Sequence, residues 1–313
     1  AVPGAGKTTT LIEIQKALPN SVGLTYSSRL KSEWRTKYTG NVHSFHSFGL
    51  FLSQSCEYKR KIQSVFDDKA LRKLLKQTPQ KPLFQFDVLL IDEVQDMCKL
   101  HYDLIEWYIS SVRRTSNSYS PIFILVGQEQ QCVYDYRQGD ERADLSYLIM
   151  PEKMFVNLTE RPWGSHRLTK SFRLNQHTAS FVNKYFHLPC ISHIQGMNSQ
   201  NNKVKYYCVD LFHYKKVANI ILTYVQLYGG SLQIISAVRE KMYDKSVATK
   251  VLNYLALCGI LVKTCESNLD DTQKAASQIQ RYTLPSCKGT EADCTIILGS
   301  DSFFDFTTTS QQF

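Results

Sequence analysis

The sequence of 313 residues contains no Cys-x-x-Cys pair, no internal repeat and no run of 18 apolar residues. A helix that crosses a bilayer needs about 20 predominantly apolar residues, so we expect no spanning helix and no membrane partner. The nine cysteines are an odd number and lie mostly in apolar stretches. This pattern favours reduced thiols in an intracellular protein over a disulfide framework or a zinc site.

An initial Met and a secretory leader are also missing. The chain begins with AVPGAGKTTT, inside what looks like a motif, so we interpret it as a fragment, and the missing leader says little about targeting. The location we expect is the cytoplasm or the nucleus, and we do not expect secretion.

Charge and composition suggest a class of partner. The net charge is +9 and the isoelectric point is about 9.0, which favours a polyanion, most simply nucleic acid. A mildly basic protein without such a partner is the alternative. Apolar residues make up 43% of the chain, enough for sizeable cores, and the length allows two domains.

The apolar pattern predicts alternating strands and helices. Continuous apolar runs that read as buried strands alternate with helical periodicity, and this favours an α/β fold with parallel sheets. The strands expected in the first half are 21–26, 86–93 and 121–127, with helices at 9–18 and 30–38. In the second half we expect strands at 203–212, 231–238 and 294–300, with helices at 215–228 and 245–259.

Two further segments bear on domain organisation. Residues 57–81 hold eight Lys or Arg against three Asp or Glu, and we interpret them as part of a small basic helical insert at about 48–82. A solvated helix face is the alternative. The Pro- and Gly-containing stretch 151–165 resembles a boundary. We therefore predict a first domain at 1–162 and a second, C-terminally incomplete, at 163–313.

The opening stretch is the first candidate site. A phosphate-binding loop has Gly, four residues, then Gly-Lys-Ser/Thr, and Gly6-Lys7-Thr8 supplies the second half with Ala1 in the first Gly position. A helix directly after the loop would turn its N-terminus toward the anion. A flexible Gly/Ala turn that holds a Lys is the alternative. The predicted nucleotide-binding residues here are Ala1, Val2, Pro3, Gly4, Ala5, Gly6, Lys7, Thr8 and Thr9.

A pair of acids ends the predicted strand at 86–93. Asp92 would hold Mg²⁺ together with Thr8, and Glu93 would polarise the attacking water of a nucleoside triphosphatase. The alternative is an ordinary strand end with two solvated acids. The apolar run before the pair and its distance from Lys7 favour the catalytic interpretation, with ATP and Mg²⁺ as cofactors.

Six motifs then occur in order along the chain: Thr25 to Arg29 (TYSSR), Ser44 to Ser47 (SFHS), Asp92 to Asp96 (DEVQD), Val126 to Arg137 (VGQEQQCVYDYR), Ser171 to Arg173 (SFR) and Thr283 to Glu291 (TLPSCKGTE). Together they resemble the motifs of superfamily 1 DNA helicases of the UvrD/Rep type. The resemblance implies two RecA-like domains with ATP between them, and 3′ to 5′ movement along single-stranded DNA.

The resemblance also implies roles for single residues. Gln131 would sense the γ-phosphate, and Arg173 would be a cationic finger brought in by domain closure. Phe172 would stack on adenine and Glu291 would accept from the ribose. The residues expected to contact DNA are Tyr26, Ser27, Ser28, His46, Ser47, Tyr134, Tyr136, Arg137 and Lys288. The alternatives are core packing for one of the two tyrosines in 134–136, a structural role for His46, a surface loop for Gln131 and a salt bridge for Arg173.

Departures from the family pattern keep other functions open. Gln128 stands where the family has Asp, and Pro285 stands where it has His. The strand before the loop, the upstream Gln segment and the last motif are missing. We predict an ATP-dependent single-stranded DNA translocase or helicase, whose partner is single-stranded DNA or DNA with single-strand tails. The alternatives are a DNA-stimulated ATPase that does not unwind and a degenerate nucleic-acid-binding module.

Overall fold

The computed structural model describes residues 1–26, 28–56, 66–132, 139–194, 203–210, 212–236, 247–264, 279–283, 287, 290 and 292–299. The chain forms two compact units, Ala1–Val204 and Lys205–Phe313. The units divide after Val204, and the domain boundary expected after residue 162 stays a prediction.

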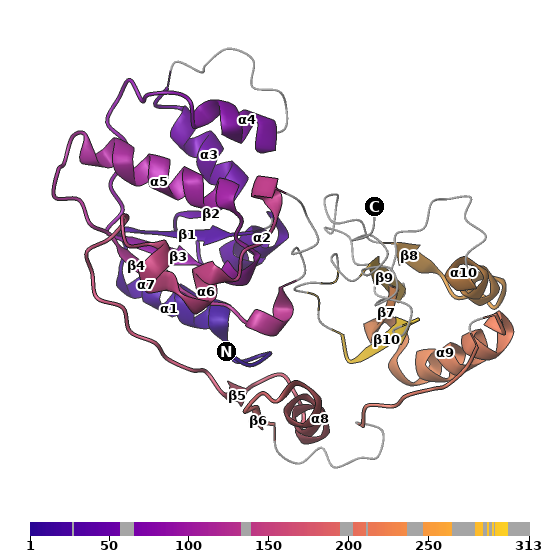
Figure 1. The fold of residues 1–313 in the computed structure, drawn as a ribbon. Coiled ribbons are helices and arrows are strands. Elements are labelled where there is room, and N and C mark those ends of the chain that lie inside the picture. The colour runs from indigo at the N-terminus through magenta and orange to yellow at the C-terminus, as the bar shows by residue number, and fades with distance from the viewer. Residues whose placement is uncertain are drawn as a thin grey trace. The chain divides into compact units, whose positions relative to one another are not determined.

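A four-stranded parallel sheet forms the centre of the first unit. Its strand order is β2-β1-β3-β4, and every neighbouring pair is parallel (Figure 1). The strands are β1 (Ser21–Thr25), β2 (Val42–Ser44), β3 (Val88–Ile91) and β4 (Ile122–Leu125). Because parallel strands share one C-terminal edge, the segments that follow β1, β3 and β4 come together there.

Helices cover both faces of this sheet. The helices of the first unit are α1 (Lys7–Ala17), α2 (Ser28–Lys37), α3 (Phe45–Ser53), α4 (Asp68–Leu74), α5 (Lys99–Arg113), α6 (Ser146–Ile149), α7 (Pro151–Met154) and α8 (Gln176–Phe186). On one face, Val88 and Leu90 of β3 pack with residues of α1 and α2. On the other, Leu89 and Ile91 pack with α3, α4 and α5. Burial on both faces explains the continuous apolar run.

The sequence predictions for this unit agree closely with the structure. The predicted strands at 21–26, 86–93 and 121–127 correspond to β1, β3 and β4, and the predicted helices correspond to α1 and α2. The expectation of an α/β fold with parallel sheets is confirmed. The helix after the loop begins at Lys7, two residues earlier than expected, so the loop leads into it without an intervening segment.

The predicted basic insert is described in part. Residues 57–65 lie outside the described residues. After them, Asp67 caps α4 by accepting from the Ala70 N–H at 2.9 Å, and Leu71 and Leu74 enter the core. Arg72 forms ion pairs with Asp140 at 2.8 Å and Glu141 at 3.5 Å. This helix therefore has a buried apolar side, and part of its basic charge is paired.

Residues 168–192, which follow the first sheet in the chain, contact the first residues of the chain. They contain β5 (Lys170–Ser171) and β6 (Ile191–Ser192), which pair in parallel, with α8 between them (Figure 1). Ala179 and Val182 of α8 and Cys190 form an apolar cluster with Val2 and Ala5. The loop at the start of the chain is thus held by side chains from 168–190.

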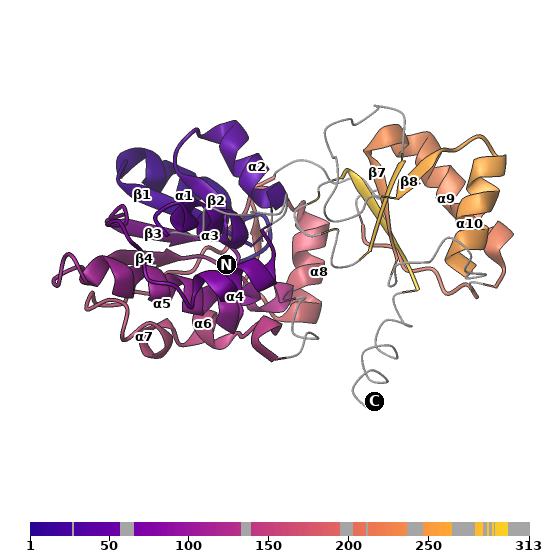
Figure 2. The same ribbon diagram turned by 90° about the horizontal axis from the view of Figure 1, so that it is seen from above.

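The second unit contains another parallel sheet, of order β10-β7-β9-β8. Its strands are β7 (Leu232–Ser236), β8 (Val262–Thr264), β9 (Ile279–Thr283) and β10 (Cys294–Leu298). Helices α9 (Tyr214–Tyr228) and α10 (Val247–Leu257) lie together on one face of it (Figure 2). The predicted strands at 231–238 and 294–300 and both predicted helices are confirmed.

The strand predicted at 203–212 is wrong for its described part. Residues 203–210 form neither helix nor strand. Side chains in this segment contact α9 instead: the Tyr207 hydroxyl lies 2.7 Å from that of Tyr224, and Lys205 Nζ lies 5.5 Å from the centre of the Tyr224 ring. Lys205 and Tyr207 of this segment therefore contact a helix and do not belong to a strand.

Candidate nucleotide-binding site

The opening loop has the backbone of an anion cradle. Gly4 and Gly6 have φ of 69° and 81°, in the left-handed region that glycine adopts without strain. Gly6 is the residue before α1, and no acidic side chain lies in the first turn of that helix. The first N–H groups of α1 are therefore available to a negatively charged group.

The apolar side chains of the loop point away from this cradle. Val2 and Ala5 are buried against α8, Pro3 is half-buried, and Ala1 and Thr9 are exposed. The loop's contribution to anion binding would thus come from its backbone and from Lys7 and Thr8.

Residues 168–173 lie directly beside the loop. The Val2 N–H donates to the Leu168 carbonyl and the Phe172 N–H donates to the Gly4 carbonyl, both at 2.9 Å. A Cβ added at Gly4 would lie 2.5 Å from the Cβ of Arg173. The backbone that carries Arg173 is therefore packed on the loop within the first unit.

Phe172 and Arg173 are both exposed. The Phe172 ring is 56% exposed, and its centre lies 4.8 Å from that of His193. An exposed aromatic ring beside the loop fits the predicted contact with a base.

The acidic pair follows β3 at the same edge of the sheet. Asp92 is 1% exposed and accepts from the Thr8 hydroxyl at 2.6 Å through Oδ2 and from the Glu93 N–H at 3.0 Å through Oδ1. Burial and the neighbouring Glu93 carboxylate raise the pKa of Asp92 to about 7, and Thr8 and Lys7 oppose this rise.

Lys7 joins the acids to Gln131. Its side chain is 8% exposed, and Nζ lies 3.8 Å from Glu93 Oε1 and 3.5 Å from Gln131 Oε1. A buried ammonium group needs such partners, and all of them come from segments that follow sheet strands. The structure therefore brings together Lys7, Thr8, Asp92, Glu93 and Gln131.

These residues fit a nucleotide with Mg²⁺. A hydroxyl oxygen and a carboxylate oxygen converge at Thr8 and Asp92, and Mg²⁺ prefers hard oxygen ligands with phosphate and water in the remaining positions. The space beside Gly4 would be filled by a Cβ, as expected where a ligand or backbone approaches closely.

Gln95 is a site residue to which the sequence analysis assigned no role. It is fully buried, donates to Glu93 Oε2 at 2.5 Å, and accepts from the Gln128 N–H at 3.0 Å. The only sequence feature that could have indicated a role for Gln95 was its place in the Asp92 to Asp96 motif. Gln128, one of the departures from the family pattern, is 3% exposed, and in the described part of the chain its Oε1 has no hydrogen-bond partner.

The residues expected to contact DNA are only partly described. Ser27, Tyr134, Tyr136, Arg137 and Lys288 lie outside the described residues, as does Glu291 of the nucleotide set. Ser28 is exposed at the start of α2. Tyr26 is half-buried after β1, with its ring edge-on to that of His101 at 5.7 Å.

His46 and Ser47 already have local partners. His46 Nε2 lies 2.6 Å from Asp68 Oδ1. The Ser47 hydroxyl accepts from the Ser44 N–H at 2.8 Å and donates to the Ser44 carbonyl at 3.1 Å, in a reciprocal cap of α3. A phosphate contact by Ser47 would have to replace a bond of this cap. The DNA contacts stay predictions.

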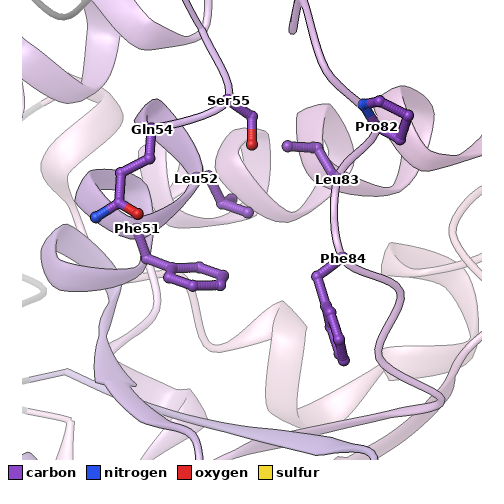
Figure 3. A pocket seen from close by; sticks show the side chains of 7 residues that line it. All are labelled: Phe51, Leu52, Gln54, Ser55, Pro82, Leu83 and Phe84. Atoms are coloured by element: carbon purple, nitrogen blue, oxygen red, sulfur yellow. The ribbon is translucent and has the colours of Figure 1, made fainter.

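A cavity elsewhere in the first unit involves none of the predicted site residues. Its volume is about 290 Å³, and it lies between the end of α3 and the segment 82–84 (Figure 3). The lining residues are Phe51, Leu52, Gln54, Ser55, Pro82, Leu83 and Phe84. Most of these side chains are apolar, and the cavity adds no charged group to the nucleotide site.

Comparison with known proteins supports the assignment of the first segment. The model of a family described as an AAA domain matches residues 1–137, which span α1, β1 to β4 and Gln131. Together with the loop geometry, this match supports a P-loop of the kind that binds nucleotides in residues 1–137.

Comparison with structures and with curated proteins adds little. One solved structure that matches is "The structure of PRRSV helicase", with a TM-score of 0.37 and 10% identity over 90% of this chain. The chain spans 50% of that chain's length. No curated protein matches. Within the described residues, no helix combines the length and the apolar character that a bilayer crossing requires.

Proposed function

We propose that the protein is an ATP-dependent translocase or helicase that moves 3′ to 5′ along single-stranded DNA. The observation that carries the proposal is the buried constellation around Lys7: the Thr8–Asp92 hydrogen bond at 2.6 Å, with Glu93 and Gln131 on the Lys7 ammonium group. The net charge of +9 and the ordered motifs support nucleic acid as the partner.

Each residue has a chemical role in this proposal. Thr8 and Asp92 would hold Mg²⁺, which when bound stabilises negative charge on the phosphate oxygens. The loop N–H groups and Lys7 bind the β- and γ-phosphates. Glu93 orients a water molecule in line with the γ-phosphate and accepts its proton. Gln131 senses the γ-phosphate, and Arg173, whose backbone lies on the loop, neutralises charge that develops on it.

A second candidate function is a DNA-stimulated ATPase that does not unwind. Two observations favour keeping it. Gln128 and Pro285 depart from the family pattern at positions expected to link the ATP and DNA sites. In addition, His46 and Ser47, both expected on DNA, are engaged with Asp68 and Ser44.

The test has two measurements. ATP hydrolysis is measured with and without single-stranded DNA, and strand displacement is measured on duplexes with a 3′ or a 5′ single-strand tail. Stimulated hydrolysis with displacement from the 3′ tail supports the proposal. Stimulation without displacement favours the second function, and no hydrolysis under either condition contradicts both.

Lys7→Ala links the activity to this site. The variant should lose hydrolysis, because the proposal places Lys7 on the phosphates, and it should stay folded with a lower melting temperature, because the largely buried Glu93 carboxylate loses its ion-pair partner. Lys16→Ala is the matched control: it lies on the same helix, is exposed, and pairs with Glu13 across one turn at 2.7 Å. Normal hydrolysis by Lys7→Ala would remove the loop from the proposed mechanism.

A further inference from the structure

The side chain of Gln95 connects the ends of two neighbouring strands. Gln95 lies in the turn Val94–Asp96 that follows β3, and its side chain is fully buried. Its amide makes one hydrogen bond to Glu93, two residues earlier, and one to the backbone of Gln128, which follows β4.

The chemistry of the partners fixes the orientation of this amide. The Gln128 N–H can only donate, so it must face the amide oxygen, Oε1, at 3.0 Å. The amide nitrogen is then directed at Glu93 Oε2, where a carboxylate accepts it at 2.5 Å. A flipped amide would place two donors together on one side and two acceptors together on the other.

The segment after β4 has a glycine, Gly127, at the position where the Gln95 amide lies. A Cβ at Gly127 would lie 2.5 Å from Gln95 Oε1 and 3.1 Å from a methyl carbon of Val94, so a larger residue at this position would displace the Gln95 amide from its place between the two strand ends. The Val94 N–H also donates to the Val126 carbonyl at 3.0 Å. The two strand ends are therefore joined through both backbone and side chain.

Glu93 needs this support because its backbone is in an unusual conformation. Its φ is 55° and its ψ is 45°, in the left-handed region that non-glycine residues rarely adopt. Its carboxylate is held on both sides, with Oε1 3.8 Å from Lys7 Nζ and Oε2 on Gln95. A strained residue persists only where its surroundings hold it.

From this geometry we propose that Gln95 is a positioning residue for the hydrolytic step. It sets the direction of the Glu93 carboxylate and ties it to the Gly127–Gln128 backbone, three residues before Gln131. The inference rests on the proposed function, in which Glu93 orients the attacking water. In this role Gln95 acts through Glu93, to which it donates, and not on the phosphate itself.

The test is a double-mutant cycle between Gln95 and Glu93. Gln95→Met keeps the length and burial of the side chain and removes both hydrogen bonds. Alone, it should lower kcat about tenfold, the lower end for loss of an outer-sphere partner, while the affinity for a fluorescent ATP analogue stays unchanged. In the Glu93→Gln background, which should already be at least about 10²-fold slower, it should lower kcat no further.

Gln15→Met is the control for removing a buried glutamine. Gln15 is 1% exposed on α1 and donates to the Asn41 carbonyl at 2.9 Å, outside the nucleotide site. Its replacement should lower the melting temperature and leave kcat unchanged. If Gln95→Met fails to fold, Gln95→Leu replaces it in the cycle, because its apolar side chain also removes both hydrogen bonds.

The outcomes separate this inference from the proposed function. A further tenfold loss in the Glu93→Gln background, or weaker nucleotide binding by Gln95→Met, would show that Gln95 acts independently of Glu93 and would overturn the inference alone. Normal turnover by Glu93→Gln would overturn the role of Glu93 in the proposed function, and the inference with it.

Discussion

At the scale of single residues, the nucleotide site consists of groups that are costly to bury. Lys7 and Asp92 are almost completely removed from water, and Gln95 is fully so. Burial of a charge costs several kcal/mol unless partners replace water, so each of these side chains needs the others. The close contacts that offset the free-energy cost of burial also fix the direction of these polar groups.

Gly4→Ala tests how closely the loop and the Arg173 segment must approach. The Gly4 φ of 69° is unfavourable for alanine, and its Cβ would lie 2.5 Å from that of Arg173. We expect a loss of about 1–3 kcal/mol in the free energy of unfolding and weaker binding of ATP analogues. Gly164→Ala is the control, because an added Cβ there meets nothing within 4 Å. Unchanged affinity and stability in Gly4→Ala would contradict the packing of this segment on the loop.

His43 predicts a loss of stability in acid. Burial, with help from Arg35 and Lys31, lowers the pKa of His43 from 6.5 to about 4. The unfolded chain therefore binds a proton that the folded chain excludes, and stability is lost as the pH falls from about 6.5 toward 4. After allowance for partial exposure, we expect His43 to account for about 1 kcal/mol between pH 7 and pH 5.

The measurement for His43 is a comparison with His43→Phe. The variant keeps an aromatic ring against Phe48 and Phe51 and does not titrate. Urea unfolding of both proteins at pH 7 and pH 5 gives the difference in stability, in which the titration of groups common to the two proteins cancels. Equal pH dependence in the two proteins would show that His43 does not contribute.

At the scale of elements, apolar runs predicted β1, β3, β4, β7 and β10, but they did not predict β2, β8 and β9 or the segments held by tertiary contacts. Residues 86–93 and 121–127 could be predicted because burial on both faces leaves a continuous apolar run. By contrast, the pattern of 203–212 predicted a strand, whereas in its described part Lys205 and Tyr207 contact Tyr224 of α9. The two-residue strands β5 and β6 are too short to leave a pattern.

The candidate site, too, could be predicted from the sequence only in part. The loop, Asp92, Glu93 and Gln131 were expected from motifs, and parallel strands explain why they meet at one sheet edge. The role of Gln95 could not be predicted, because its two partners depend on the backbone of Gly127–Gln128. The packing of Arg173 on the loop depends in turn on the α8 cluster.

Ser47→Ala separates a helix cap from a nucleic-acid contact. In the structure Ser47 and Ser44 cap α3 reciprocally, and loss of such a cap costs about 0.5–2 kcal/mol. We expect this loss of stability, with no change in the slope of single-stranded DNA affinity against salt concentration. Ser53→Ala, at the other end of α3, is the comparison variant. A flatter salt slope in Ser47→Ala alone would support the predicted phosphate contact.

At the scale of the whole molecule, the proposed function assigns nucleotide binding to the first unit and the coupling of ATP to nucleic acid to the second. The hydrogen bonds from the loop to Leu168 and Phe172, and its apolar cluster with α8, lie within the first unit. The motif around Thr283 and Lys288, expected to connect ATP with DNA, belongs to the second unit. The proposed function thus predicts that the two activities can be separated by truncation.

A chain that ends at Val204 should still bind ATP. The loop, Asp92, Glu93 and the Arg173 segment all remain, and a compact unit of this size can fold by itself. We expect affinity for a fluorescent ATP analogue to fall by no more than about tenfold, the equivalent of one lost hydrogen bond of about 1.4 kcal/mol, as from Glu291 to the ribose. Stimulation of hydrolysis by single-stranded DNA should disappear, because the second unit is absent. Circular dichroism and a melting curve establish that the shortened chain is folded, and Gly4→Ala in the same background checks that binding occurs at the loop. If the folded Ala1–Val204 protein does not bind the analogue, then residues after Val204 form an essential part of the nucleotide site, and the loop with its neighbours in the first unit is insufficient.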